Sequence, residues 1–387
     1  MATSSEIRNT LELKRKRRVA VRIIALFLSL LLIILAIIYR DKLSPDAISN
    51  WLSQSVTADS GKTGFPVQLP PGEILSVDAQ GSNVLVTNQT GLYFYSPSGK
   101  LLRSVNHAKK NAQAICSGDN VLAFEVGGSL YSVETDSKTK ISKELESSIL
   151  TGAISKNGRF ALVTDSDVYT CDMQVYDKNG NAVFKWSPSG SAISAVALSQ
   201  DGYHVAAATV YTQNGKLISG VHLFSTSKSE ALISKSLEDE IVLKLNCQSN
   251  SISVITDKGY FTVNSEGEIV RRYDFGEKKL ITSKPYKNGM VFIFEDVNDP
   301  NKSVLSVVSK DANEIAGVNI DGKAVDSDIS GDNVYILTPS HLYSYDVETA
   351  IRRGTAALEG EGERLCATVG GGYVVTSTYE LIKPELK

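Results

Sequence analysis

A turn signal that recurs about every 40 residues constrains this chain more than any other feature. From residue 81 onward, polar turns occupy equivalent places, and the steps between their last residues are 37, 38, 44, 48, 39, 44 and 39. The turns are Gly81–Asn83, Gly118–Asn120, Lys156–Gly158, Gln200–Gly202, Gln248–Asn250, Lys287–Gly289, Gly331–Asn333 and Gly370–Gly372. Each precedes a short apolar run such as Val84–Val86 or Val334–Leu337. Runs of this length and composition between turns predict β-strands.

A second series of strands follows seven of these turns, with examples at Gly91–Tyr95 and His341–Tyr345. Most are followed by another polar turn and a further strand. Four strands in a unit of about 40 residues predict a β-propeller, because a closed ring packs each sheet between two neighbours. The last unit, from about Glu363, lacks an outer strand, which Phe65–Leu69 would supply. We predict an all-β propeller of about eight four-stranded blades, with seven blades as the alternative.

Residues 19–39 form an apolar segment that only Arg22 and Ser29 interrupt. At ~1.5 Å per residue, such a helix spans roughly 30 Å and can cross the hydrocarbon core of a bilayer. The basic run Lys14–Arg18 precedes it, and the positive-inside bias then places the N-terminus in the cytoplasm. A cleaved signal peptide is the alternative. The length of the apolar run and the lack of an A-x-A-like site favour an uncleaved anchor.

These patterns divide the chain into four predicted segments. They are a cytoplasmic basic tail at 1–18, a transmembrane signal anchor at 19–39, a juxtamembrane helix and stem at 40–64, and an extracytoplasmic propeller at 65–387. The net charge of −3 divides accordingly, since residues 1–22 carry +5 and the remainder −8. With 42% apolar and 21% charged residues, a disordered chain and a polytopic membrane protein are excluded. The expected location is the cell membrane, crossed once.

Two of the turns carry a family resemblance. The segments Ser155–Val163 and Ser199–Ala206 resemble the S-x-D-G-x-x-x-A element of WD40-like and YVTN-like bacterial propellers, although no repeat has a Trp-Asp ending. The layout of basic tail, single span, stem and propeller is similar to an uncharacterised clostridial membrane family, domain of unknown function 5711. The resemblance implies the propeller fold and the membrane topology, and it supplies no catalytic residue.

The sequence contains no motif for catalysis or cofactor binding. Gly61–Thr63 lacks the earlier glycine of a phosphate-binding loop, and the four histidines have no metal-binding spacing. Asp177–Asn181 begins like a calcium loop but fits a hairpin turn better. We interpret further carboxylates as solvated loop groups rather than calcium ligands, namely Asp296, Asp299, Asp326, Asp328 and Asp332. We therefore predict no cofactor, no metal site and no enzymatic activity.

Four cysteines are too few and too scattered for a disulfide scaffold. Cys116, Cys247 and Cys366 fall on the innermost strands of units two, five and eight, which are not neighbours in an eight-bladed ring. Cys171 is expected in a loop of unit three. Free thiols are the expected state.

Loop length points to a candidate binding surface. In propellers, the connections between second and third strands emerge on one rim, and three of these are long here, at residues 164–172, 209–220 and 295–303. The second contains Gln213–Lys216, a hairpin signal. Neutral insertion is one interpretation, and a recognition surface is the other. The candidate binding rim consists of Asp165, Asp167, Tyr169, Tyr211, Asp296 and Asp299.

Acidic and aromatic loop residues suit protein or glycan contacts better than nucleic acid. We predict a single-pass, membrane-anchored extracytoplasmic propeller that acts as a non-catalytic scaffold for a protein or glycan of the envelope or cell surface. The alternative is a propeller enzyme or ligand sensor that uses a metal or cofactor at the mouth of the central channel. A transmembrane signal transducer would require residues 1–18 to dock a separate protein.

Overall fold

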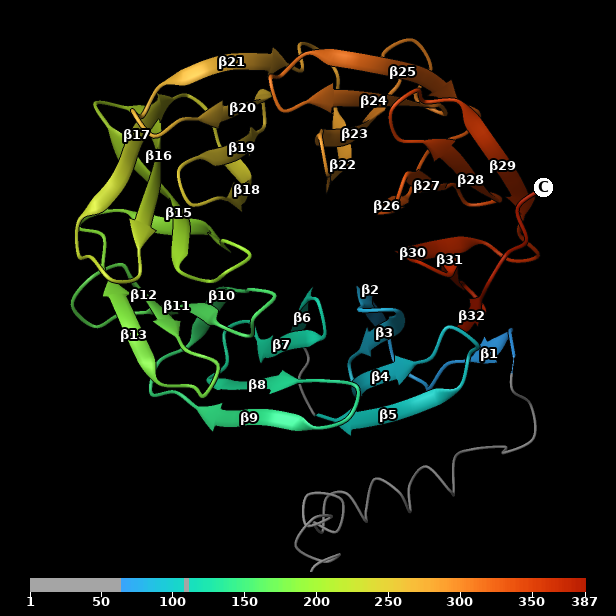
Figure 1. The fold of residues 1–387 in the computed structure, drawn as a ribbon, viewed down its shortest axis with the longest axis horizontal. Helices are drawn as coiled ribbons and strands as arrows, with labels where there is room; N and C mark the ends of the chain where they lie inside the picture. The colour runs from blue at the N-terminus through green and yellow to red at the C-terminus, as the bar shows by residue number, and fades with distance from the viewer. Residues whose placement is uncertain (1–63, 108–110) are drawn as a thin grey trace, which may run out of the picture. The chain divides into compact units, whose positions relative to one another are not determined.

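The computed structural model describes residues 64–107 and 111–387, which lie within one compact unit, Thr63–Lys387. Eight four-stranded antiparallel sheets form a ring in which the first strand of each sheet surrounds the ring axis (Figure 1). This confirms the predicted eight-bladed propeller. The predicted tail, span and stem up to residue 63 lie outside the described residues. Within the described ranges, no helix is long and apolar enough to cross a membrane.

The blades follow one another along the chain. Blade 1 comprises β2 (Ile74–Gln80), β3 (Asn83–Asn88), β4 (Gly91–Tyr95) and β5 (Leu101–Asn106). Blade 2 comprises β6 (Ala112–Ser117), β7 (Asn120–Glu125), β8 (Leu130–Glu134) and β9 (Thr139–Glu144). Blade 3 comprises β10 (Ile149–Ile154), β11 (Phe160–Asp165), β12 (Cys171–Tyr176) and β13 (Ala182–Trp186). Blade 4 comprises β14 (Ala192–Leu198), β15 (His204–Gln213), β16 (Lys216–Ser225) and β17 (Ala231–Glu238).

The second half of the ring has the same plan. Blade 5 comprises β18 (Val242–Cys247), β19 (Ile252–Thr256), β20 (Gly259–Val263) and β21 (Ile269–Asp274). Blade 6 comprises β22 (Leu280–Tyr286), β23 (Gly289–Glu295), β24 (Ser303–Ser309) and β25 (Glu314–Ile320). Blade 7 comprises β26 (Asp326–Ser330), β27 (Asn333–Leu337), β28 (His341–Asp346) and β29 (Arg352–Ala357). Blade 8 comprises β30 (Gly362–Thr368), β31 (Gly371–Thr376), β32 (Glu380–Ile382) and β1 (Val67–Gln68).

The core lies between the faces of neighbouring blades. Second strands are buried on both faces, as in β3, where Val84, Leu85 and Val86 are all fully buried. Their sequences are therefore continuous apolar runs rather than alternating ones. Outer strands such as β17 face solvent on one side and keep few buried residues, here Ile233 and Leu237. Because every sheet has a neighbour on each face, the ring buries apolar surface that an isolated sheet would expose.

The two turns with the family resemblance join first and second strands, and their chemistry explains their sequence. The Ser199 hydroxyl donates to Asp201 Oδ1 (2.5 Å), and the same carboxylate oxygen accepts from the Tyr203 backbone N–H (3.1 Å). Gly202 follows at φ +68°, a conformation that favours glycine. In blade 3, the Ser155 hydroxyl and Asn157 Oδ1 form the equivalent contact at 2.6 Å.

Both ends of the described chain close the ring in blade 8. Strand β1 pairs with β32 through Val67↔Leu381 and Gln68↔Glu380, so the segment Phe65–Leu69 supplies the outer strand as predicted. The Phe65 ring lies 5.4 Å from the Tyr373 ring. The Tyr373 hydroxyl donates to the Pro97 carbonyl oxygen of blade 1 (3.3 Å). The closure therefore joins blade 8 to blade 1 through the Tyr373 hydrogen bond and through a shared core cluster in which Tyr373 packs with Val84 and Tyr93.

Antiparallel order divides the connections between two rims. We call the rim formed by connections between second and third strands, and between successive blades, the 2–3 rim. The opposite rim, formed by turns between first and second and between third and fourth strands, is the 1–2 rim. Hydrogen bonds link the two kinds of connection on the 2–3 rim, as from the Phe275 N–H to the Lys258 carbonyl oxygen (2.9 Å).

All four cysteines are free. Cys116, Cys247 and Cys366 lie on the innermost strands β6, β18 and β30, as predicted. The prediction for Cys171 was wrong, because it begins strand β12 and is paired with Asp165 rather than lying in a loop.

Candidate functional site

The long loop of blade 3 presents some of the predicted rim residues and uses another for structure. Asp165 ends β11, and its Oδ1 accepts from the Ser148 N–H (2.7 Å) of the connection between blades 2 and 3. That carboxylate therefore fastens the loop to its neighbour. Asp167 and Tyr169 are exposed, and Val168 between them is 81% exposed. The loop thus offers an apolar tip flanked by a carboxylate and a phenol.

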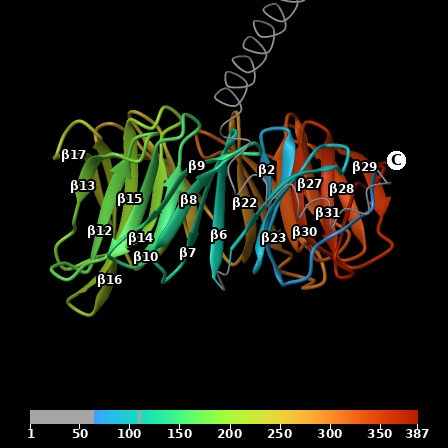
Figure 2. The same ribbon diagram turned by 90° about the horizontal axis from the view of Figure 1, so that it is seen from below.

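The predicted hairpin of blade 4 is confirmed. Strands β15 and β16 pair from His204↔Ser225 to Gln213↔Lys216, and each is ten residues long. Asn214 and Gly215 at the tip have φ values of 53° and 76°, as a type I′ turn requires. Tyr211 pairs with Ile218 near the tip and is half-buried. Figure 2 shows β16 extending at the edge of the ring on the 2–3 rim.

The loop of blade 6 is held by its own carboxylates. Asp296 Oδ1 accepts from the Asn298 N–H (2.8 Å), and Asp299 Oδ1 accepts from the Asn301 N–H (3.0 Å). The Lys302 ammonium lies 3.7 Å from Asp299 Oδ2. These contacts shape the loop and leave Val297 exposed at its tip. Both aspartates are therefore loop carboxylates, as interpreted from the sequence.

The six predicted residues lie on one rim but not in one patch. Blades 3 and 4 are neighbours, so Asp165, Asp167 and Tyr169 share a sector with Tyr211 (Figure 1). Blade 5 separates that sector from Asp296 and Asp299 of blade 6. A partner that contacts both sectors must therefore cross blade 5.

Exposed apolar side chains connect these sectors, and the sequence analysis missed most of them. Of the eighteen large apolar side chains exposed in the described part of the chain, seven lie in connections of the 2–3 rim and three in turns of the 1–2 rim, and the other eight lie in strands. The seven are Val126, Val168, Tyr169, Ile241, Val297, Val325 and Tyr379. Leu130, Leu150 and Leu243 lie at strand ends that border the same rim, and five other strand residues border the 1–2 rim in the same way, namely Leu102, Val183, Leu232, Val270 and Ile315. Ile241 and Leu243 belong to blade 5 and so fill the gap between the predicted sectors.

A recurring β-bulge accounts for two of the missed residues. The pairing of β10 with β11 shifts between Ile149 and Thr151, so Leu150 is the extra residue, and Leu243 holds the same place in β18. In each blade the preceding residue is buried while the bulged leucine is exposed. A bulge allows this because it re-aims one side chain. The sequence signal for these bulges is a pair of adjacent apolar residues at the start of an inner strand, Ile149–Leu150 in β10 and Val242–Leu243 in β18.

The 2–3 rim is also acidic. Its described connections, excluding the strands themselves, contain five basic residues and twelve acidic ones. The acidic residues are Glu73, Glu146, Asp167, Asp239, Glu240, Asp257, Glu277, Asp296, Asp299, Asp321, Glu359 and Glu361. Exposed apolar groups surrounded by carboxylates fit a partner surface that is apolar and basic.

Two aspartates interpreted as loop carboxylates occupy another position. Asp326 and Asp328 lie on the innermost strand β26, where Asp326 Oδ2 accepts from the Leu365 N–H (3.0 Å) and Asp328 Oδ2 from the Ala367 N–H (2.8 Å). The interpretation was wrong because these carboxylates satisfy free N–H groups on the edge of the next blade's inner strand β30. Asp332 is exposed in the turn after β26.

Lysines from the neighbouring inner strands complete this network. Lys284 Nζ lies 3.2 Å from Asp328 Oδ1, and Lys244 Nζ donates to the Ser283 carbonyl oxygen (3.2 Å). Burial would lower the pKa of Lys284, but the carboxylates of Asp328 and Asp326 raise it overall. Burial raises the pKa of Asp326. Within residues 64–107 and 111–387, no group of three or more His, Cys, Asp or Glu side chains is placed to hold a metal ion.

This architecture defines a β-propeller of eight blades, and solved structures of low sequence identity share its fold. A computationally designed protein, Ika8, matches with a TM-score of 0.60 and 13% identity, covering 83% of this chain and 99% of its own. Sqt1 from Saccharomyces cerevisiae matches with a TM-score of 0.55 and 8% identity, covering 83% of this chain and 98% of its own. BamB from Moraxella catarrhalis matches with a TM-score of 0.51 and 12% identity, covering 84% of this chain and 98% of its own. No curated protein matches the chain in sequence.

A family profile identifies the chain more narrowly. It matches residues 73–362, which is most of the propeller, and its description is Family of unknown function (DUF5711). The chain belongs to this family, as the sequence layout suggested.

Proposed function

We propose that this protein is a membrane-anchored, extracytoplasmic propeller that binds a partner protein on its 2–3 rim and has no catalytic role. The observation that carries the proposal is that seven large apolar side chains are exposed in the described connections of that rim, against three in the turns of the 1–2 rim. Exposed apolar groups that adjoin one another mark interaction surfaces, and Val168 adjoins Tyr169 in the loop of blade 3. Propellers of the WD40 and BamB type share the fold, and this likeness supports the proposal at the level of architecture.

The entry point of the chain suits this use of the 2–3 rim. The Gly64 carbonyl oxygen lies near Gly99, in the turn between β4 and β5 on the 1–2 rim. A tether that joins the propeller at Gly64 therefore attaches on the rim opposite the exposed apolar side chains. The anchor itself is the apolar segment 19–39.

Site-specific photocrosslinking in live cells tests this proposal. A crosslinking amino acid at Val168 on the 2–3 rim, and in separate strains at Tyr211 and Asp299, is expected to capture one recurring protein, identified by mass spectrometry. Val369 on the 1–2 rim is the matched control, because it is also an exposed valine (90% against 81%) in a short connection. Capture of no specific neighbour from the three rim positions, or of the same proteins from Val369, would contradict the proposal.

A propeller enzyme or sensor with a metal or cofactor at the channel mouth is the competing function. It predicts that the purified full chain retains a stoichiometric ion or chromophore, which elemental analysis and an absorption spectrum would detect. The charged side chains of the inner strands give this function little support, because the carboxylates of Asp326 and Asp328 already accept hydrogen bonds from backbone N–H groups of β30.

A further inference from the structure

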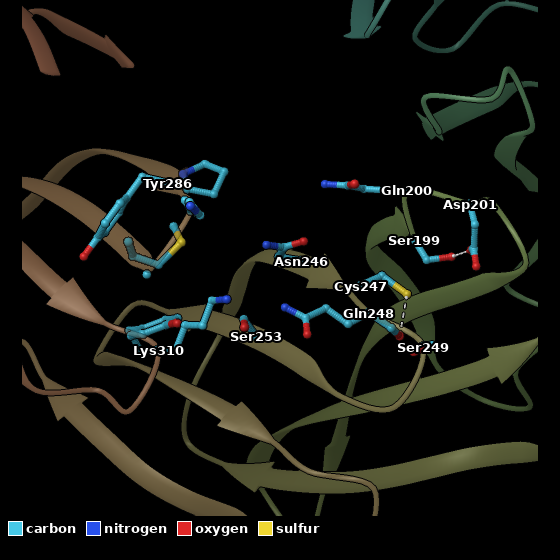
Figure 3. A pocket seen from close by; sticks show the side chains of 15 residues that line it. Ser199, Gln200, Asp201, Asn246, Cys247, Gln248, Ser249, Ser253, Tyr286 and Lys310 are labelled. Atoms are coloured by element: carbon cyan, nitrogen blue, oxygen red, sulfur yellow. Dashed lines mark hydrogen bonds between the residues drawn. The ribbon is translucent and has the colours of Figure 1, made fainter. Parts of the chain in front are cut away.

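A polar cavity of about 710 Å³ lies on the 1–2 rim, opposite the candidate binding loops. It is bounded by the turns between first and second strands of blades 4, 5 and 6. Figure 3 shows Gln200 and Asp201 on one side, Tyr286 on the other, and Asn246 and Gln248 between them. Its volume falls in the range of ~300–1,000 Å³ typical of small-ligand sites.

The lining is rich in groups that both donate and accept hydrogen bonds. Side-chain amides come from Gln200, Asn246 and Gln248, and hydroxyls come from Ser249 and Ser253. Within residues 64–107 and 111–387, no hydrogen bond is found to the amides of Gln200 and Asn246. An amide offers donors and acceptors side by side, as a sugar hydroxyl does. The wall of the cavity is therefore complementary to a ligand with several hydroxyl groups.

A buried tyrosine gives the cavity a fixed polar group. Tyr260 lines the cavity although only 2% of its surface is exposed. Its ring packs against Phe292 with centroids 5.6 Å apart. Among the described residues, no hydrogen bond to the Tyr260 hydroxyl is found. The hydroxyl is not among the fully buried side-chain oxygens that lack a partner, so it reaches the cavity, where a ligand group can pair with it in place of water.

The charges that line the cavity favour an anion. Lys287 and Lys310 are exposed cations, and Asp201 is the opposing carboxylate. Asp201 already accepts from the Ser199 hydroxyl and the Tyr203 N–H. No acceptor is found for the Lys310 ammonium in the part of the chain that the structure describes. An ammonium group has three donors and no acceptor, so an anionic acceptor such as a carboxylate suits it.

We propose that this cavity binds an acidic saccharide. Its hydroxyls would pair with the amides of Gln200 and Asn246 and with the Tyr260 hydroxyl, and its carboxylate would pair with Lys310. A neutral sugar would leave the lysines without a partner, and an anion without hydroxyls would leave the amides unused. The site lies on the other rim from the proposed protein surface, so either proposal can fail while the other holds.

Calorimetric titration of the full chain with trigalacturonate tests the ligand class. The fully methyl-esterified trisaccharide is the matched probe, because it retains the ring hydroxyls and loses the charges. The acid is expected to bind, and the ester to bind at least about tenfold more weakly, as loss of a charged hydrogen bond implies. The absence of binding by trigalacturonate at millimolar concentration would overturn the proposal. Equal binding of acid and ester would do the same.

Substitutions locate the binding in the cavity. Lys310→Ala is expected to weaken trigalacturonate binding about tenfold, while Tyr260→Phe, which keeps the ring, should weaken it about fivefold. Lys178→Ala is the control, since Lys178 holds the same place in the turn between third and fourth strands of blade 3 and is exposed away from the cavity. If Lys310→Ala and Lys178→Ala bind alike, the proposed site is wrong.

Discussion

The two rims of the propeller arise from the same repeat, yet they expose different chemistry. In the described residues, the connections of the 2–3 rim have seven exposed large apolar side chains and the turns of the 1–2 rim have three. The connections of the 2–3 rim that the structure describes, which leave out residues 108–110, contain twelve acidic and five basic residues, whereas the turns of the 1–2 rim contain ten and eight. The described connections of the 2–3 rim are thus more apolar and more acidic than the turns of the 1–2 rim.

The difference follows from what each connection must do. On the 1–2 rim, the repeated Ser–Asx–Gly turns use their polar side chains to hold the backbone, as Asp201 does. On the 2–3 rim, length varies more freely, and the second strand of blade 4 extends to ten residues against five to seven in the other blades. Loops released from a structural requirement tolerate change and carry function. The repeat therefore constrains one rim and leaves the other open to specialisation.

The largest expected effect concerns the ring closure at the 1–2 rim. Tyr373→Ala should lower the free energy of unfolding by about 3–5 kcal/mol, because it removes a fully buried aromatic side chain. Urea denaturation of the full chain measures the change. Tyr379→Ala is the control in the same blade, on the 2–3 rim and 47% exposed, with an expected change within about 0.5 kcal/mol. Equal losses in the two variants would show that the closure does not depend on Tyr373.

The next largest effect concerns the partner. Val168→Asp should weaken binding of the protein captured on the 2–3 rim by about 2 kcal/mol, roughly thirtyfold, because it places a charge in an apolar contact. Val369→Asp on the 1–2 rim should change the affinity less than about twofold. Surface plasmon resonance with the full chain gives both values. Affinity that responds to both substitutions, or to neither, would remove the functional distinction between the rims.

The repeat made the ring predictable from the sequence, including its closure. Four strands per unit and the spare strand at Phe65–Leu69 are local patterns, so eight blades could be counted directly. The hairpin tip was predictable for the same reason, because Asn214 and Gly215 specify a turn type by themselves. These features depend on residues adjacent in the sequence.

Contacts between blades could not be predicted in this way. Asp326 and Asp328 looked like loop carboxylates, but their partners are backbone groups of β30, 39 residues further along. The exposure of Leu150 and Leu243 could not be predicted, because the bulge that exposes them depends on pairing with the next strand. The saccharide cavity combines turns of three blades. Each of these features requires the spatial order of strands, which spacing alone does not supply.

A smaller effect compares one carboxylate from each rim. Asp201→Ala on the 1–2 rim should lower the free energy of unfolding by about 1 kcal/mol, because the turn loses two hydrogen bonds. Those bonds, chiefly the one from the Ser199 hydroxyl, lower the pKa of Asp201 in the folded state. The stability that the Asp201 carboxylate contributes is therefore fully present above its pKa in the unfolded chain and is lost as the pH falls through its pKa in the folded chain. Asp167→Ala on the 2–3 rim should stay within about 0.5 kcal/mol. Urea titrations at neutral and acidic pH check both variants, and an equal loss in the two would contradict this contrast.

The smallest effect lies between the rims, on inner strand β2, and has the opposite sign. Burial raises the pKa of Asp78, although the Ser76 hydroxyl donates to it (2.6 Å) and Lys284 opposes the shift. A raised pKa means that protonation favours the folded state, so this stability is full below the unfolded pKa and declines as the pH rises through the folded one. Asp78→Asn should therefore be more stable than the unsubstituted chain at pH 7, and the advantage should vanish as the pH approaches 4. Asp332→Asn, at an exposed turn, is the control and should stay within about 0.5 kcal/mol at both pH values. An Asp78→Asn chain that is less stable at pH 7 would mean that the charge of Asp78 is needed by Lys284, and that the inner network stabilises the ring through its ion pairs rather than its hydrogen bonds.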